Sequence, residues 1–384
     1  MHRRNTRGGG YRDRARNDRI LGALIIVFAI LLGILLWRDR IEENRKIAEL
    51  NELREQLYAE KQAQEEALKQ KAAEDSFYQK LADGFDVNVL IVGDSIGAGG
   101  GIETGGKQWF KQLHTYLQSI TDGKVLLTNV SMGGNTSYAG YVRTMTLDDD
   151  VDYDLAVICY GQNDSVTGFP TNYESIIRAI KKKYPNCSII SILESSQKKY
   201  TDKMIAIQNI CEHYSIPVAD TIEAFNNSGK AYEELTNDGV HPNDAGQEIY
   251  FETVRSIIDE NVSAYTGKMV EAEAIDDGVY KFDNFAWFDA ASDFERMDDV
   301  TFKLNVSASG ILGIDYIYES GDNKADIYVD GELFESPTVT FNYDYSQRHI
   351  LIVREDCTVE KEIEVVFNSK EQADGFKGMC FSWK

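Results

Sequence analysis

Residues 87–95 read Val-Asn-Val-Leu-Ile-Val-Gly-Asp-Ser, an apolar run that ends in a polar turn. Four similar apolar runs follow along the chain, at residues 125–130, 155–159, 188–193 and 216–219. Helix patterns lie between and after them, at residues 106–119, 172–183, 203–214 and 243–259. Apolar strands that alternate with helices are typical of a parallel sheet covered on both faces. Residues 81–266 are therefore expected to form an α/β domain, with a parallel sheet as the middle of three layers.

Polar groups suited to catalysis follow the ends of three of these strands. Ser95 comes after the first strand, Gly134 lies in the turn after the second, and Asn163 follows the third. Because ligands of such sheets bind beyond the carboxyl ends of the strands, these residues are expected on one rim. A fourth segment, Asp-Gly-Val-His-Pro, carries Asp238 and His241 directly before the last helix.

His241 is the candidate general base. A serine hydroxyl becomes a useful nucleophile when a neighbouring base takes its proton, and histidine suits that exchange near neutral pH. Four of the five histidines, which lie near the N-terminus, in helix patterns or in a distant β-rich region, are set aside: His2, His114, His213 and His349. Asp238 can hold one imidazole nitrogen of His241 while the other faces Ser95.

Three amides are expected to stabilise the oxyanion of such a reaction. The N–H of Ser95 should lie at the start of a helix, where the helix dipole favours negative charge. Gly134 has no Cβ, so a second backbone amide can approach closely, and Asn163 supplies a side-chain amide. One donor of this type is typically worth about 10²–10³ in turnover.

Each segment also has an ordinary structural explanation. Gly-Asp-Ser is a common turn, the Asn-Asp pair at residue 163 suits a helix cap, and Pro242 suits the first position of a helix. Their occurrence together favours the catalytic interpretation. In this order, the four segments resemble the SGNH (GDSL-type) hydrolase family over residues 86–260.

The resemblance implies a flavodoxin-like fold and acyl-ester chemistry. Matched residue by residue, it implies that Ser95 is the nucleophile and that Gly134 and Asn163 are further oxyanion-hole positions. It implies that Asp238 is the acid and that His241 is the base. The departures are small, since the second segment reads Ser-Met-Gly-Gly at residues 131–134 and Gln162 stands where threonine or glycine is common. Neither departure removes a reacting group.

The N-terminal part predicts a membrane anchor. Residues 1–19 carry seven Arg against two Asp and are expected to form a cytoplasmic basic arm. Residues 20–37 are uncharged, long enough to cross a bilayer, and followed directly by Arg38. A cleaved signal peptide would have a shorter apolar region and small residues after it, and a buried soluble helix would have a polar face. The basic arm then keeps the N-terminus in the cytoplasm and places the enzyme outside the cell.

Residues 38–80 are expected to form a helical stalk, because they are rich in Glu, Lys, Gln, Ala and Leu. Leu50, Leu53 and Leu57 have coiled-coil spacing, but the next two such positions are polar. A solvated stalk is preferred, and a homodimer through it stays open.

Residues 267–384 predict a β-sandwich, jelly-roll-like, because short strand patterns alternate there with turns. Asp330-Gly331 suits a hairpin turn. This part holds 25 acidic against 11 basic residues in a chain of net charge -23, which argues against nucleic acid as a partner. Its aromatic residues either fill the core or stack on sugars, and the pair Asp298-Asp299 lacks the pattern of a calcium loop. Cys357 and Cys380 could pair, but the odd cysteine count argues against a disulfide framework.

The sequence thus predicts an extracytoplasmic serine esterase that removes O-acetyl groups from a carbohydrate or acts on another small ester. No phosphate-binding loop and no zinc spacing is present, so no cofactor and no metal is expected. Two alternatives stay open. One is an O-acetyltransferase for a cell-wall or capsular polysaccharide, as membrane-tethered relatives in the family imply, and the other is a catalytically silent adhesion or assembly module.

Overall fold

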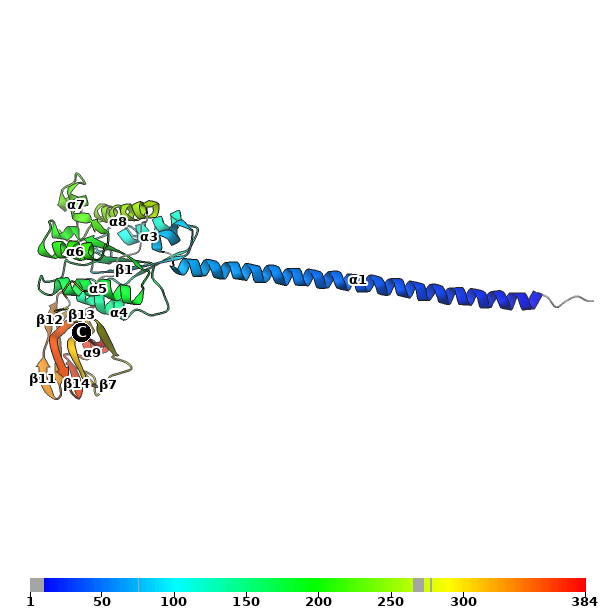
Figure 1. The fold of residues 1–384 in the computed structure, drawn as a ribbon. Helices are drawn as coiled ribbons and strands as arrows, with labels where there is room; N and C mark the ends of the chain where they lie inside the picture. The colour runs from blue at the N-terminus through cyan, green and yellow to red at the C-terminus, as the bar shows by residue number, and fades with distance from the viewer. Residues whose placement is uncertain (1–9, 75, 265–272, 277) are drawn as a thin grey trace, which may run out of the picture. The chain divides into compact units, whose positions relative to one another are not determined.

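The computed structural model describes residues 10–74, 76–264, 273–276 and 278–384 (Figure 1). The chain divides into two units, residues 1–73 and residues 74–384. The described residues of the first unit all lie in one long helix, α1 (Gly10–Glu74). Within it, Gly22–Ala63 is long and apolar enough to cross a membrane, a property that it shares with signal sequences. The expected span and stalk are therefore parts of one continuous helix.

The second unit contains the expected parallel sheet. Its strands are β1 (Val87–Gly93), β2 (Val125–Asn129), β3 (Leu155–Cys159), β4 (Ser188–Leu193) and β5 (Val218–Asp220). All neighbours pair in parallel, in the order β2-β1-β3-β4-β5. This order is that of flavodoxin-like, doubly wound sheets. The prediction of a parallel-sheet α/β domain is confirmed.

Helices cover both faces of this sheet, because the strands are apolar on both sides. In β1, Leu90 and Val92 point to one core, and Val89 and Ile91 point to the other. The helices on the first face are α4 (Ser137–Met145), α5 (Phe169–Lys183) and α6 (Asp202–His213). Those on the second are α2 (Phe77–Ala82), α3 (Trp109–Ile120) and α8 (Asp244–Ala264), while the short α7 (Thr221–Asn226) packs on α8. The expected boundary between the stalk and the hydrolase domain, at residues 80 and 81, falls inside α2. In the structure, Phe77 and Leu81 of this helix lie in the core of the hydrolase domain.

The C-terminal part of the unit is an antiparallel β-sandwich. One sheet has the order β13-β9-β15-β6, and the other has the order β11-β10-β14-β8-β7 with β12 paired to β10. The strands of the first are β6 (Asn284–Asp289), β9 (Ala308–Tyr318), β13 (Gln347–Val359) and β15 (Phe376–Trp383). Those of the second are β7 (Glu295–Arg296), β8 (Thr301–Asn305), β10 (Gly321–Val329), β11 (Glu332–Glu335), β12 (Thr338–Phe341) and β14 (Glu362–Phe367). The helix α9 (Lys370–Asp374) precedes β15, and the turn at Asp330 and Gly331 connects β10 to β11.

The two faces of the sheet β13-β9-β15-β6 have different partners. Leu312 and Phe381 point into the core of the sandwich, whereas Ile350 and Cys380 join the core that contains α4. The Cys380 thiol lies 3.4 Å from the Tyr138 hydroxyl of α4. All five cysteines are buried and free, so Cys357 and Cys380 are not paired. Helix α4 is thus packed between a parallel and an antiparallel sheet.

Candidate active site

Ser95 lies in a tight turn that follows β1, and no α-helix begins there, contrary to expectation. The backbone N–H of Gly100 donates to the Ser95 carbonyl at 2.8 Å, and the Ile96 N–H donates to Asp94 Oδ1 at 2.8 Å. The glycine-rich sequence that follows favours a turn over a helix, since glycine is a poor helix former. Trp109 donates from its indole to the Ile96 carbonyl, and both side chains are fully buried, so they belong to the core and not to a substrate entrance.

The structure brings Ser95, His241 and Asp238 together in one chain of hydrogen bonds. The distance from His241 Nε2 to Ser95 Oγ is 2.8 Å, and that from His241 Nδ1 to Asp238 Oδ2 is 2.6 Å. Asp238 Oδ1 accepts from the backbone N–H groups of His241 at 2.8 Å and Val240 at 3.0 Å. The carboxylate therefore fixes both the loop and the ring, and this geometry is the one in which a histidine can take a proton from serine.

The same contacts keep Asp238 ionised. Burial acts to raise its pKa, but the hydrogen bonds from the His241 backbone and ring and from the Val240 backbone outweigh this and lower the pKa to about 2. Since its folded-state pKa is depressed, the carboxylate contributes stability above about pH 4, and this contribution is lost as the pH falls towards 2. At neutral pH, Asp238 is a permanent acceptor for the imidazole N–H.

A glycine-rich turn supports the other side of His241. A Cβ on Gly100 would lie 3.1 Å from His241 Cδ2, and one on Gly101, whose φ is +91°, would lie 2.7 Å from His241 Cβ. The Gln247 amide donates to the Gly100 carbonyl at 2.9 Å and accepts from the Trp109 N–H at 2.9 Å. Sequence reasoning missed Gln247, because its role depends on contacts with α3 and the turn rather than on a local motif. These contacts fix the base against the nucleophile.

Two backbone amides beside Ser95 are free to donate. Within the described residues, neither the Ser95 N–H nor the Gly134 N–H has an acceptor. Gly134 adopts φ +69°, a conformation that favours glycine. The Asn163 amide, by contrast, donates to the Asn135 carbonyl at 3.0 Å and to Asp94 Oδ2 at 3.3 Å. All the residues expected on the rim thus follow the ends of adjacent strands.

Strand β13 of the sandwich reaches this rim, which sequence reasoning did not anticipate. A Cβ on Gly134 would lie 2.9 Å from His349 Cε1, and a Cβ on Gly133 would collide with the side-chain amide of Gln347. His349 stacks on Tyr318 with ring centroids 4.1 Å apart, and burial lowers its pKa to about 4, so it is neutral at physiological pH. His349 was expected in a distant region. It lies instead beside a predicted oxyanion-hole residue.

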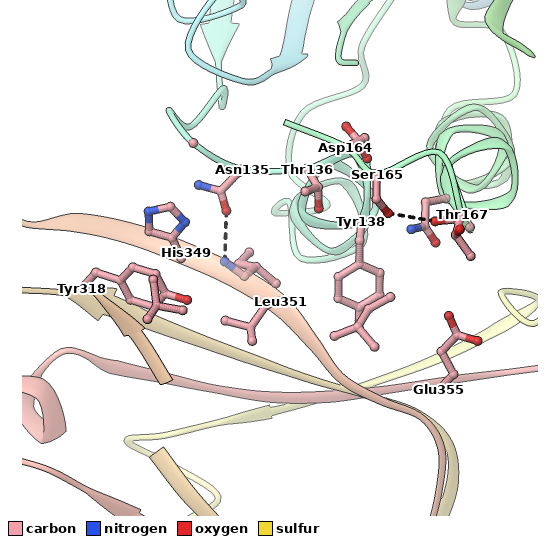
Figure 2. Close-up of a pocket in the computed structure, with 16 residues that line it drawn as sticks. Asn135, Thr136, Tyr138, Asp164, Ser165, Thr167, Tyr318, His349, Leu351 and Glu355 are labelled. Carbon is pink, nitrogen blue, oxygen red and sulfur yellow. Dashed lines mark hydrogen bonds between the residues drawn. The ribbon is translucent and has the colours of Figure 1, made fainter. Parts of the chain in front are cut away.

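Asn135 holds β13 in this position. Its Nδ2 donates to the Arg348 carbonyl at 2.9 Å. Its Oδ1 accepts from the Ile350 N–H at 3.0 Å, which is the dashed line at Asn135 in Figure 2. β13 is an edge strand, so this amide satisfies backbone groups that would otherwise be unpaired. Asn135 is 2% exposed, and no signal in its local sequence distinguishes it from an ordinary turn residue. The Asn135 side chain therefore connects the turn at Gly133 and Gly134 to the sandwich.

A cavity of about 460 Å³ lies between the loops of the parallel sheet and β13. Figure 2 shows Asn135, Ser165 and Thr167 on one side, and the stacked rings of His349 and Tyr318 on the other. Ser165, Thr167 and Gly168, in the loop that follows β3, line this cavity. Of the predicted site residues, Gly134 lines the cavity, whereas Ser95 and His241 do not.

A metal centre is not apparent in the part of the chain that the structure describes, where no group of three His, Cys, Asp or Glu side chains is arranged to hold an ion. Asp298 uses one carboxylate oxygen to accept from the Val300 and Thr301 N–H groups. Its role there is to stabilise a turn.

Comparisons with known proteins bear on the family and on the fold of the chain. Residues 91–249 match the model of the GDSL-like lipase/acylhydrolase family. A two-domain esterase (CEX) active on acetylated mannans, co-crystallized with mannopentaose, is 15% identical, with a TM-score of 0.64 over 80% of this chain and 94% of that chain. No curated protein sequence matches the chain.

Two other solved structures match less of the chain. An acetyl xylan esterase, AlAXEase, is 21% identical over 44% of this chain and 99% of its own, with a TM-score of 0.37. A carbohydrate esterase family 3 protein from Talaromyces cellulolyticus is 18% identical over 47% of this chain and 100% of its own, with a TM-score of 0.37.

The match of residues 91–249 to this acylhydrolase family identifies the chain as an ester hydrolase. The parallel-sheet domain and the sandwich together share their fold with the two-domain esterase.

Proposed function

We propose that the chain is an extracytoplasmic esterase that removes O-acetyl groups from a polysaccharide with Ser95 as nucleophile. The observation that carries the proposal is the hydrogen-bonded series of Ser95, His241 and Asp238 beside two free backbone amides. The test is incubation with a fluorophosphonate probe, which should label Ser95 in the wild-type protein. A probe that leaves Ser95 unlabelled would support the silent adhesion module instead.

The first half of the reaction forms an acyl-enzyme. Ser95 Oγ attacks the acetyl carbonyl carbon while its proton passes to His241 Nε2, and Asp238 holds the Nδ1–H of the resulting imidazolium. The oxyanion accepts hydrogen bonds from the Ser95 and Gly134 N–H groups and from the Asn163 amide, which turns one N–H from the Asn135 carbonyl to the oxyanion and keeps the other on Asp94. The tetrahedral intermediate collapses as His241 returns the proton to the sugar oxygen, which leaves as a hydroxyl group.

The second half repeats these steps with water. His241 takes a proton from the water that attacks the acetyl carbon, and the same three donors hold the second oxyanion. Collapse releases acetic acid, which loses its proton to the solvent to give acetate, as the proton on His241 returns to Ser95 Oγ. Every step uses groups of this chain and water, so the proton balance closes without a cofactor.

The acetylated polysaccharide is inferred from the surroundings of the site. The cavity beside Gly134 combines polar loop residues with the rings of His349 and Tyr318, and aromatic faces are favourable surfaces for sugar rings. Tyr343 and Tyr345, 57% and 51% exposed, follow β12 and pack on Phe341, whose ring contacts Tyr318 and His349. The two-domain esterase with the shared fold acts on acetylated mannans, which supports the same class of substrate here.

Transfer to a second sugar is the alternative fate of the acyl-enzyme. Hydrolysis is favoured by the exposure of the site, since Asn163 and Asp238 are both exposed and water reaches the rim freely. Purified protein with an acetylated glycan donor and an unacetylated glycan acceptor separates the two activities. Free acetate without acetylated acceptor is expected, and acetyl groups on the acceptor would establish the transferase.

We also propose that α1 anchors the enzyme with the N-terminus in the cytoplasm and residues 74–384 outside. The apolar side chains between Leu24 and Trp37 are 47–68% exposed in the structure, which supports burial in a bilayer. The full chain is expected to stay with membranes after an alkaline wash and to be degraded by protease added outside the cell. A soluble, shortened product would indicate a cleaved signal sequence.

Asn163→Ala is expected to lower kcat for a small aryl acetate about 10²–10³-fold, because one of three oxyanion donors is lost. KM should change little, since this donor acts mainly on the transition state. Asn226→Ala, at an exposed position at the end of α7, is the matched control and should retain wild-type turnover. A decrease of less than about tenfold would remove Asn163 from the oxyanion hole.

Gln347→Ala is expected to raise KM for an acetylated oligosaccharide about tenfold, with a smaller effect on a small aryl acetate. The reason is that Gln347 reaches the rim from the sandwich, at Gly133, where the sugar rather than the acetyl group would pass. Steady-state kinetics on both substrates measure the difference. Equal effects on the two substrates would contradict a contact with the sugar.

A further inference from the structure

Two acidic side chains lie completely buried beneath the candidate nucleophile. Asp94 precedes Ser95 directly and Glu194 follows β4, and both are 0% exposed. A third acid, Asp164, is 8% exposed and accepts hydrogen bonds from the Ser137 N–H and hydroxyl groups. Among the described residues, no Lys, Arg or His forms an ion pair with Asp94 or Glu194. Two unpaired negative charges in such a place would be very costly.

The contacts of the two carboxyls differ. Both oxygens of Asp94 accept hydrogen bonds, Oδ1 from the Ile96 N–H at 2.8 Å and Oδ2 from the Asn163 amide at 3.3 Å. Glu194 Oε1 accepts from the Cys159 thiol at 3.4 Å, whereas Oε2 receives no hydrogen bond from any described residue. A buried carboxyl oxygen without a donor is the natural position for a proton. Glu194 is therefore suited to be the neutral member of the pair.

The electrostatics agree with this division. Burial raises the pKa of Glu194 well above its ordinary value, and the charge of Asp94 raises it further. Burial also raises the pKa of Asp94, to about 7, against the effect of hydrogen bonds from Ile96 and Glu194. Two interacting acids of this kind share protons, and the proton that is held most strongly belongs to Glu194.

The titratable groups that face the pair from the surrounding elements are Cys159, Tyr160, Asp164, Tyr173, His241 and Tyr250. Burial raises the pKa of the thiol and of the three phenols, so these groups are neutral. The remaining groups near the pair that can carry a charge are His241 and Asp164, and burial raises the pKa of Asp164.

We propose that Glu194 is a neutral carboxylic acid in the working enzyme, and that its O–H positions the Asp94 carboxylate, which in turn holds the Asn163 amide at the oxyanion hole. Glu194 touches no substrate and acts as a positioning residue. The proposal rests on the function proposed above, because it assigns a role to Asn163. It also gives the Asp residue before Ser95 a purpose beyond the turn that it forms.

Infrared difference spectroscopy of the full-length protein tests the protonation state directly. At neutral pH, the wild-type protein should show the C=O stretching band of a protonated carboxyl, and Glu194→Gln should remove it. Glu174→Gln is the matched control, because the buried Glu174 acts as acceptor for Tyr214 Oη at 2.6 Å and the Ile275 N–H at 2.9 Å. A band that Glu194→Gln leaves unchanged, or no such band in the wild type, would overturn the proposal.

Kinetics on a small aryl acetate test the positioning role. Glu194→Leu removes the donor and should lower kcat about tenfold or more. It should also move the acid limb of the pH profile to higher pH, because Asp94 loses a group that stabilises its anion. Glu194→Gln, whose amide N–H donates from the same place, should restore most of the lost activity. If Glu194 were ionised, Glu194→Gln would instead move the acid limb about one unit or more to lower pH.

The outcomes separate this proposal from the proposed function. The infrared measurement needs no substrate, so an inactive protein that shows the Glu194 band would refute the esterase reaction and leave the protonation of Glu194 established. Thermal unfolding of each variant identifies losses of activity that come from misfolding. If Glu194→Leu folds and keeps wild-type kcat, the positioning role is wrong even where the band is present.

Discussion

Ser95→Ala is expected to lower turnover of a small aryl acetate by about 10⁴-fold or more, because the acyl-enzyme can no longer form. The residual rate would come from the oxyanion donors and from substrate binding, which act on direct attack by water. Initial rates at saturating substrate measure the change. Removal of one hydroxyl from a half-buried turn should leave the unfolding temperature close to that of the wild type.

Ser131→Ala is the control for this variant. The Ser131 hydroxyl lies near the same turn, 3.0 Å from the position of a Cβ on Gly93, and has no hydrogen-bond partner in the described part of the chain. Its removal should leave turnover close to that of the wild type. If Ser95→Ala keeps more than about a tenth of the wild-type rate, the covalent mechanism is wrong, and the esterase reaction must use another nucleophile.

Asp238→Asn is expected to lower kcat by about 10³–10⁴-fold with little effect on KM. The Asp238 carboxylate accepts the His241 Nδ1–H at 2.6 Å and stays ionised because its pKa is about 2. An asparagine amide can donate to Nδ1 and favour the tautomer whose Nε2 carries the proton, and this tautomer cannot accept a proton from Ser95. The acid limb of the pH profile should also move to lower pH, since the imidazolium loses its anionic partner.

Asp220→Asn provides the comparison for Asp238→Asn. Asp220 is another carboxylate that accepts a backbone N–H, from Glu223 at 2.9 Å, and asparagine caps a helix about as well as aspartate. Its kcat and pH profile should match those of the wild type. An Asp238→Asn variant with an unmoved acid limb would show that the carboxylate does not stabilise the charged ring.

Most of the parallel sheet could be predicted from the sequence, because its strands are buried on both faces and are therefore nearly continuous apolar runs. Helix α4 could not be predicted, for a related reason. Tyr138 of this helix contacts Cys380 of the sandwich, whereas Gly140 packs against Tyr160 and Ile176 of the parallel-sheet domain, so no polar face marks the period of the helix. The helix expected at Ser95 was wrong, since the glycines after it allow a tighter turn.

The candidate site, like the fold, could be predicted from the sequence only in part. Ser95, His241 and Asp238 could be assigned because the acid and base lie three residues apart and the strand end directs the serine to the rim. The contacts of Gln347 and His349 could not, since they depend on how the sandwich packs more than 200 residues away along the chain. No sequence motif identifies Glu194. Its character comes entirely from its burial beside Asp94.

The position of α4 between two sheets limits how this enzyme can be re-engineered. A binding module tied only by a linker can be exchanged for another without loss of the catalyst, whereas here removal of the sandwich would uncover Tyr138 and the apolar surface around it. It would also leave the Asn135 side chain without the backbone groups of β13 to which it is hydrogen-bonded. Chimaeras that keep β9, β13 and β15 as a fixed platform, and vary only the far sheet and its loops, are the ones that should remain soluble and active.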